Sequence, residues 1–282
     1  MPTDVRRAAV TGKPVAHSLS PVLHGAAYEA LGLPWTYTRL EASEAELPEL
    51  VAGLDESWVG LSVTMPGKGA ALALATTTTD RATDRAKAVG AANTLVRRDD
   101  GWAADCTDVE GVAGALRAAG FGSGSSAVVL GAGGTARAAI AGLAELGVSS
   151  ATVVVRDPAR AEAARTCAAA VGVKLEVVAW AAADFPALVA GSSVLVNTAP
   201  PDAVSPAALG GAPFLLDVIY HPWPTPLATA VAAHGGHVAT GLDMLLHQAF
   251  GQVEQFTGKA APRQAMRDAL HTATGGILPL PL

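Results

Sequence analysis

Ala127-Val128-Val129-Leu130-Gly131-Ala132-Gly133-Gly134-Thr135-Ala136 decides the fold of the second half of this chain. The four apolar residues at its start predict a buried strand, and residues 137–146 predict an alanine-rich helix. Gly131 allows the tight turn between them, and Gly133 lets a phosphate approach the backbone. The N-terminus of the helix adds amide donors and a partial positive charge. We therefore expect a pyrophosphate site at Gly131, Ala132, Gly133, Gly134 and Thr135, and the alternative is a plain glycine-rich turn.

The strand that follows this helix indicates which dinucleotide fits. It is expected at residues 151–155, and Arg156 and Asp157 come directly after it, with Arg160 one turn further on. An arginine at this place suits the 2′-phosphate of NADP, whereas an acidic residue suits the ribose 2′-hydroxyl of NAD. Arg156 therefore favours NADP and Asp157 leaves NAD possible. The alternative is that these side chains are ordinary solvated charges.

Strand and helix patterns alternate along both halves of the chain. Further strands are expected at residues 8–11, 35–40, 59–64, 175–179, 194–197 and 214–219. Helices are expected at residues 21–31, 44–54, 242–256 and 262–274. Asp100-Gly101 lies between two apolar runs and predicts a β-hairpin. The alternation predicts an α/β protein whose sheets are largely parallel, with helices in the crossover connections.

Composition excludes several classes of protein. Half of the 282 residues are hydrophobic, which supports a sizeable core, and the net charge of −6 disfavours nucleic-acid binding through a basic surface. No apolar run is long enough to span a membrane, and residues 1–13 lack the apolar region of a secretory signal. Cys106 and Cys167 have no metal-site spacing. We expect a cytoplasmic enzyme without a metal, acting on a small molecule.

Two serines follow the first expected strand. Ser18 and Ser20 have one residue between them, so an extended backbone would point both hydroxyls the same way. Together with the N-terminus of the next helix they could bind a carboxylate. The alternative is that one serine only caps the helix that begins near Pro21.

Three further polar residues stand at strand ends or at the expected domain boundary. Lys68 follows the strand and the Pro-Gly turn of Ser62-Val63-Thr64-Met65-Pro66-Gly67, at the strand end where ligands bind in α/β proteins. Asn93 enters a strand, and Asp108 lies near the expected boundary between domains. Each has an ordinary alternative, since a lysine is usually a solvated charge and an aspartate can simply cap a helix.

Taken together, these segments resemble the shikimate dehydrogenase family over nearly the whole chain and in the family's order. The matching motifs are HSLSP at 17–21, SVTMPGK at 62–68, GAANT at 90–94, CTD at 106–108, the glycine loop at 131–136, DVIYHP at 217–222 and GLDMLLHQ at 241–248. The resemblance implies an N-terminal α/β substrate domain and a Rossmann-type, doubly wound NADP-binding domain.

The resemblance also implies a role for each matching residue. Lys68 and Asp108 would be the catalytic acid–base pair of an NADP-dependent reduction of 3-dehydroshikimate to shikimate. The implied substrate ligands are Ser18, Ser20, Thr64, Asn93, Tyr220 and Gln248. Gly241 and Arg156 would join the glycine loop in binding the cofactor. The substrate domain is expected to comprise residues 1–107 and 241–282, with the cofactor domain at 108–240, in a monomer or homodimer.

Three residues depart from the family pattern. Ser62 and Cys106 stand where the family usually has asparagine, so each position loses an amide; Ser62 can still donate one hydrogen bond, whereas Cys106 is expected to be structural. Asp157 leaves the preference for NADP open. The alternatives are a quinate or aminoshikimate-type dehydrogenase using NAD or NADP, and a non-catalytic NADP-binding regulator.

Overall fold

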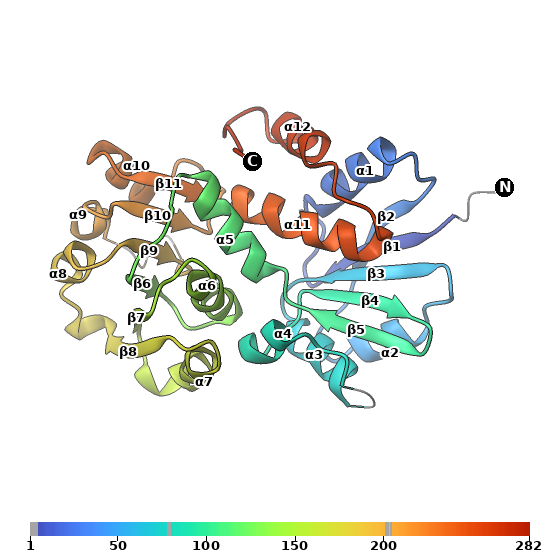
Figure 1. The fold of residues 1–282 in the computed structure, drawn as a ribbon, viewed down its shortest axis with the longest axis horizontal. Coiled ribbons are helices and arrows are strands. Elements are labelled where there is room, and N and C mark those ends of the chain that lie inside the picture. The colour runs from blue at the N-terminus through green and yellow to red at the C-terminus, as the bar shows by residue number, and fades with distance from the viewer. Residues whose placement is uncertain (1–4, 78–79, 201–202, 204) are drawn as a thin grey trace. The chain divides into compact units, whose positions relative to one another are not determined.

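The computed structural model describes residues 5–77, 80–200, 203 and 205–282 (Figure 1). The chain forms two compact units. The first comprises Met1–Thr107, Leu246–Leu280 and Leu282, and the second comprises Asp108–Leu245 and Pro281. In the described part of the chain, each unit is built around one β-sheet with helices on both faces.

The first unit contains a mixed sheet in the order β2-β1-β3-β4-β5. Its strands are β1 (Arg7–Gly12), β2 (Thr36–Glu41), β3 (Trp58–Val63), β4 (Thr94–Arg98) and β5 (Gly101–Asp105). β1 is parallel to β2 and β3, while β4 is antiparallel to both of its neighbours. The hairpin expected at Asp100-Gly101 is therefore confirmed.

Helices cover both faces of this sheet. They are α1 (Ser20–Ala30), α2 (Leu47–Ala52), α3 (Lys68–Thr76), α4 (Asp84–Val89), α12 (Arg263–Ala273) and the part of α11 (Gly241–Thr257) from Leu246 onward. Alternate strand residues face opposite layers, as the pleat requires. Leu61 and Leu95 pack with α2 and α3, whereas Ala8 and Val96 pack with Phe256 of α11. Helix α2 begins later than expected, at Leu47. Pro48 has no amide proton to donate, so it fits only in the first turn of a helix.

The second unit contains a parallel sheet in the order β11-β10-β9-β6-β7-β8. The strands are β6 (Ser126–Leu130), β7 (Ser150–Val155), β8 (Lys174–Ala179), β9 (Val194–Asn197), β10 (Phe214–Asp217) and β11 (His237–Thr240). Numbered within the unit, this is the order 3-2-1-4-5-6 of dinucleotide-binding folds. β10 ends two residues before the expected end, because the Asp217 carboxylate accepts a hydrogen bond from the amide of Ile219 and turns the chain.

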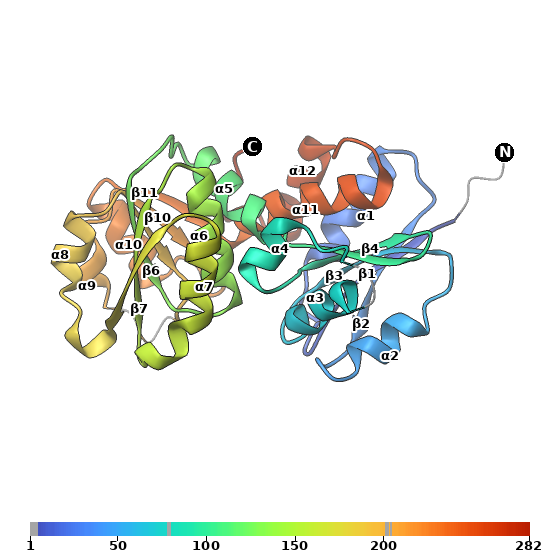
Figure 2. The same ribbon diagram turned by 60° about the horizontal axis from the view of Figure 1, so that its bottom comes forward.

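Helices lie on both faces of the second sheet (Figure 2). They are α5 (Asp108–Ala118), α6 (Gly134–Glu145), α7 (Glu162–Ala170), α8 (Phe185–Ala190), α9 (Pro206–Leu209) and α10 (Pro226–Ala233), with short 3₁₀ turns η1 (Pro158–Ala161) and η2 (Trp180–Ala182). Val128, Leu195 and Leu215 of the sheet pack against α8, α9 and α10 in one apolar core. Among the described residues, no helix has the length and apolar character needed to cross a membrane.

Candidate active site

The polar residues predicted in the first unit gather at one edge of its sheet. Chain direction explains this: β1, β3 and β5 end at the edge where β4 begins. The segments that leave or enter these strand ends carry Ser18 and Ser20, Thr64 and Lys68, and Asn93. Residues 75 positions apart in sequence, such as Ser18 and Asn93, are therefore brought to one edge by topology.

The segment after β1 carries the two serines. Ser18 is half-buried and Ser20 is buried, and the Ser18 hydroxyl donates to Oγ of Ser20 over 3.2 Å. No side chain caps α1, whose N-cap residue is Leu19. A simple capping role therefore does not explain either hydroxyl, although Ser18 Oγ also accepts from the amide of Ser20 over 3.3 Å.

The segments after β1 and β3 are held together by their backbones. The amide of Thr64 donates to the carbonyl of Thr11 over 2.8 Å, and the amide of Lys13 donates to the carbonyl of Met65 over 3.0 Å. Lys68 is the first residue of α3, and its carbonyl accepts from the amide of Ala92 over 2.9 Å. Thr64 and Lys68 are thus fixed beside the serine segment and the GAANT segment.

Asn93 is the centre of a buried polar network. Its Nδ2 donates to Oγ1 of Thr107 over 3.0 Å and to Oε1 of Gln248 over 3.2 Å. Its Oδ1 accepts from the Thr107 amide over 2.8 Å and from the Thr94 hydroxyl over 2.9 Å. The structure therefore brings Asn93 and Gln248 together, and donors on two sides fix the orientation of the Asn93 amide.

Two further buried residues, neither of them predicted from the sequence, extend this network. Gln252 donates from Nε2 to the Asn93 carbonyl over 3.1 Å and to the Thr94 hydroxyl over 3.0 Å. Thr107 contacts both Asn93 and Gln248. A sequence signal for Gln252 exists, because it follows Gln248 by four residues and so lies on the same face of α11.

The Ser62 hydroxyl already has hydrogen-bond partners within the network. Its hydroxyl donates to Oε1 of Gln252 over 2.6 Å and accepts from the Tyr37 hydroxyl over 2.6 Å. A serine has one proton to donate, so the donor expected at Ser62 is already used inside the protein. Cys106, the other departure from the family pattern, is buried and donates its backbone amide to Asp105 over 2.8 Å.

The glycine loop of the second unit lies beside the point where the strand order reverses. β6 is flanked by β7 and β9, and α6 starts at Gly134 directly after the loop. Gly131 has a φ of +104°, and a Cβ there would lie 2.5 Å from Oγ1 of Thr198, so only glycine fits. At Gly133 an added Cβ would meet nothing within 4 Å, so the backbone there is open to a ligand. This loop fits a dinucleotide pyrophosphate at the N-terminus of α6.

The residues after β7 distinguish between the two cofactors. Arg156 and Arg160 are exposed. The Asp157 carboxylate instead caps η1, accepting from the amide of Ala159 over 3.0 Å. That cap gives Asp157 a structural reason to be present, so its acidity is not by itself a signature of NAD.

Asp108, Tyr220 and Gly241, the remaining predicted site residues, belong to the second unit. Asp108 is buried and is the first residue of α5. Tyr220 is half-buried, and Gly241 lies so close to the carbonyl of Val218 and the Tyr220 ring that a side chain there would collide with both. The predicted pairing of Lys68 with Asp108 concerns one residue of each unit and stays a prediction.

Burial raises the pKa of Asp217, despite hydrogen bonds from Thr225, Ile219 and Asn197. The Thr225 hydroxyl donates over 2.7 Å and Nδ2 of Asn197 over 3.0 Å. Asp217 precedes the segment that carries Tyr220, so these contacts fix the start of that segment.

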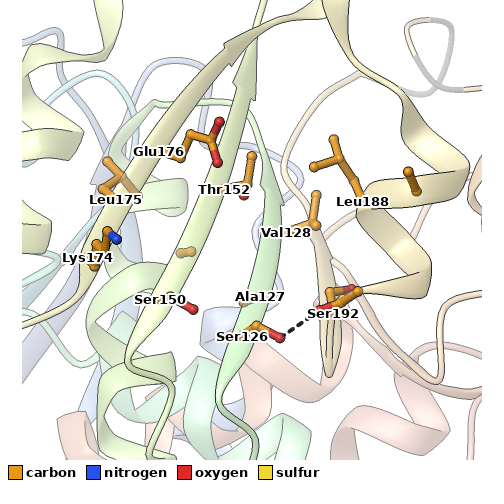
Figure 3. Close-up of a pocket in the computed structure, with 13 residues that line it drawn as sticks. Ser126, Ala127, Val128, Ser150, Thr152, Lys174, Leu175, Glu176, Leu188 and Ser192 are labelled. Carbon is orange, nitrogen blue, oxygen red and sulfur yellow. Dashed lines mark hydrogen bonds between the residues drawn. The ribbon is translucent and has the colours of Figure 1, made fainter.

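A pocket of about 320 Å³ lies elsewhere on the second unit (Figure 3). Ser126, Ser150 and Lys174, the first residues of β6, β7 and β8, line it. It is therefore at the amino-terminal edge of the sheet, whereas the glycine loop follows the carboxyl end of β6. The Ser126 hydroxyl donates to the carbonyl of Gly191, and the Ser150 hydroxyl donates to that of Ser125. Both hydroxyls therefore stabilise the fold.

Comparison with known proteins agrees with this arrangement. Residues 10–95 match the shikimate dehydrogenase substrate binding domain, and residues 241–271 match the shikimate 5′-dehydrogenase C-terminal domain. A shikimate dehydrogenase (NADP(+)) of Methylobacterium radiotolerans is 42% identical over 266 residues, which cover 89% of this chain and 91% of that protein.

Two solved structures of shikimate dehydrogenases are similar over almost their full length. The crystal structure of Mycobacterium tuberculosis shikimate dehydrogenase is 52% identical, with a TM-score of 0.88 over 95% of this chain and 99% of that one. The shikimate 5-dehydrogenase of Thermus thermophilus, in complex with NADP(H) and shikimate, is 31% identical, with a TM-score of 0.81 over 95% of this chain and 100% of that one. With its two matched domains and these relatives, the chain belongs to the shikimate dehydrogenase family.

Proposed function

We propose that this protein catalyses the reversible, NADP-dependent reduction of 3-dehydroshikimate to shikimate. One observation carries the proposal: Ser18, Ser20, Thr64, Asn93 and Gln248 gather at one sheet edge in a chain that also has a glycine loop for a dinucleotide. The relatives named shikimate dehydrogenase (NADP(+)) support the same reaction.

The polar edge of the first sheet suits a small polyhydroxylated carboxylic acid. The Ser18 hydroxyl donates to Ser20 in the structure, and after rotation both hydroxyls can donate to a carboxylate. Hydrogen bonds to a charged group are the stronger kind. Thr64, Asn93 and Gln248 offer hydroxyl and amide groups that match ring hydroxyls. Tyr220 is proposed as a further substrate ligand.

The second unit suits NADP. The pyrophosphate would be held at the N-terminus of α6 by Gly131, Ala132, Gly133, Gly134 and Thr135. Arg156 would pair with the 2′-phosphate, and Gly241 would be a further cofactor-binding residue. When bound, the cofactor supplies or accepts the hydride. Arg156 is exposed and its guanidinium offers a fork of donors that matches a phosphate.

Lys68 and Asp108 are proposed as the acid–base pair. In the reductive direction, the Lys68 ammonium polarises the ketone oxygen and donates its proton to that oxygen. In the oxidative direction, the neutral amine accepts the proton of the hydroxyl. Asp108 stabilises the ammonium and holds a substrate hydroxyl, so its removal would misplace both groups.

Initial rates test the proposal. The purified protein is assayed with shikimate and with quinate, each with NADP and with NAD, by the absorbance of the reduced nicotinamide. We expect the highest kcat/KM with shikimate and NADP. A higher kcat/KM with quinate would assign the enzyme to the quinate-type dehydrogenases instead. NADP binding without turnover of either alcohol would contradict a catalytic role and favour a regulator.

A further inference from the structure

One residue of the substrate unit outside the family motifs is connected by hydrogen bonds to the buried network around Asn93. Tyr37 lies on β2, the edge strand of the first sheet, and its ring stacks on His24 of α1 with centroids 4.0 Å apart and planes 12° apart. The stacking aims the phenol hydroxyl at Ser62 of β3, to which it donates over 2.6 Å. The ring is therefore held by packing and the hydroxyl by a short hydrogen bond.

The hydrogen bonds from Tyr37 run in one direction. A hydroxyl has a single proton, so donation from Tyr37 to Ser62 leaves Ser62 to donate its own proton to Oε1 of Gln252. Nε2 of Gln252 then donates to Thr94, and the Thr94 hydroxyl donates to Oδ1 of Asn93 over 2.9 Å. The orientation of the Asn93 amide is thus linked to Tyr37 through three intervening side chains.

Oε1 and Nε2 of the Gln252 side chain cannot exchange places within this chain of hydrogen bonds. Its Nε2 faces the Asn93 carbonyl, which can only accept. Its Oε1 faces Ser62 and Nε2 of His24, the latter at 3.3 Å. Burial lowers the pKa of His24 to about 3, against the hydrogen bond with Gln252. The imidazole is therefore neutral, and its Nε2–H tautomer donates to Gln252.

β2, the strand that carries Tyr37, also contacts the serine segment. Burial raises the pKa of Tyr37 far above its ordinary value, while hydrogen bonds with Ser62 and Ser20 act to lower it. Ser20 in turn accepts from Ser18. Two residues further along the same strand, Nη2 of Arg39 donates to the Ser18 carbonyl over 2.6 Å. β2 therefore supports the serine segment through Arg39.

We propose that Tyr37 is a positioning residue for the substrate, because its hydroxyl begins the chain of hydrogen bonds that orients Asn93. The inference rests on the proposed function. Tyr37 acts on Asn93 through Ser62, Gln252 and Thr94. Its loss is therefore expected to weaken substrate binding, whereas proton transfer at Lys68 continues.

The test compares Tyr37→Phe, Ser62→Ala, the double variant and Tyr28→Phe. Tyr28 is the matched control, because it belongs to the same aromatic cluster, 6.5 Å from Tyr37 between ring centroids, and its buried hydroxyl has no hydrogen-bond partner among the residues that the structure describes. Phenylalanine at position 37 keeps the stacking on His24 and removes only the hydroxyl.

We expect Tyr37→Phe to raise the KM for shikimate about 3- to 10-fold, the loss typical of one hydrogen bond, with kcat within about 2-fold and the KM for NADP unchanged. Tyr28→Phe should change neither KM. Because Tyr37 acts largely through Ser62, the double variant should have a KM close to that of Ser62→Ala, well below the product of the two single effects.

Three outcomes would overturn the inference. The first is an unchanged KM for shikimate in an active Tyr37→Phe. The second is an equal rise in the KM for shikimate and for NADP, which would indicate a general structural defect. The third is independent, multiplicative effects of the two substitutions. A wild-type protein that neither binds nor oxidises shikimate would overturn the proposed function and this inference together, so the two failures are distinguishable.

Discussion

The carboxylate of Asp105 forms a two-pronged ion pair with the guanidinium of Arg85: Nε donates to Oδ1 over 2.7 Å, and Nη2 donates to Oδ2. The same carboxylate accepts from Thr83 over 2.6 Å and from Gln255 over 2.7 Å. Asp105 ends β5, Arg85 lies on α4 and Gln255 lies on α11. One buried carboxylate therefore joins β5, α4 and α11. Asp105 lies two residues before Thr107, which contacts Asn93.

Replacing Asp105 with Asn should destabilise the fold. Burial alone would raise the pKa of Asp105, but the hydrogen bond and charge of Arg85, with hydrogen bonds from Thr83 and Gln255, outweigh it and hold the pKa below the ordinary aspartate value. We expect a loss of about 2–3 kcal/mol at neutral pH, less than for a fully buried pair because Arg85 is 24% exposed. Urea unfolding would measure it. Asp80→Asn, in a largely exposed pair with Lys87, should cost less than about 1 kcal/mol.

The Arg85–Asp105 pair predicts that the free energy of unfolding depends on pH. The folded carboxylate binds a proton less readily than the unfolded one, so the stability it contributes is complete above the ordinary aspartate pKa. It is lost as the pH falls through the lowered pKa of the folded state. The difference in unfolding free energy between wild type and Asp105→Asn should therefore shrink below about pH 4. A constant difference down to about pH 3 would contradict this assignment.

Lys68→Ala should lower kcat about 10²- to 10⁴-fold, the usual value of a positioned acid–base group, with little change in substrate affinity. Steady-state rates with shikimate and NADP, together with binding of shikimate by calorimetry, would separate the two effects. Lys87→Ala, on α4 of the same unit, is a suitable control. Near-normal turnover in Lys68→Ala would remove Lys68 from the mechanism.

Ser18→Ala and Ser20→Ala should chiefly raise the KM for shikimate. Each hydroxyl is expected to donate to the substrate carboxylate, and a hydrogen bond to a charged group contributes about 1.5–3 kcal/mol. Ser43→Ala, at a half-buried serine four residues before α2, should leave KM unchanged. If KM stays the same in both site variants, the carboxylate binds elsewhere.

Arg156→Gln should raise the KM for NADPH and leave the KM for NADH nearly unchanged, because only NADPH carries the 2′-phosphate. Arg165→Gln, an exposed arginine on α7, is the matched control and should alter neither value. Equal effects of Arg156→Gln on the two cofactors would disprove a 2′-phosphate role.

Two glycines of the cofactor loop should respond differently to alanine. Gly131→Ala forces a side chain into a left-handed backbone and against Thr198, so we expect a loss of stability of about 1–3 kcal/mol. Gly133 has a φ of −74° and free space around it, so Gly133→Ala should fold normally and still weaken NADP binding, because its methyl group would occupy the open space where the pyrophosphate is expected. Thermal unfolding and NADP titration would distinguish the two.

Local patterns in the sequence predicted most of the strands. β9 was predicted with its observed bounds, because three apolar residues are followed by Asn197, and the Asp100-Gly101 hairpin followed from its turn chemistry. β11 was missed, since only Val238 and Ala239 of His237–Thr240 are apolar. The helices α8 and α9, of six and four residues, were missed because they are too short to show a helical period.

The sequence by itself determined the strand–glycine–helix unit at 126–145 and the motif residues of both units, because these depend on neighbours along the chain. Only the tertiary structure decided which polar groups meet. Ser62 and Gln252 are 190 residues apart, and Tyr37 lies outside every motif, yet one chain of hydrogen bonds joins them. Hydrogen bonds require their partners within about 3.5 Å, and at such separations only the packing of strands and helices sets that distance.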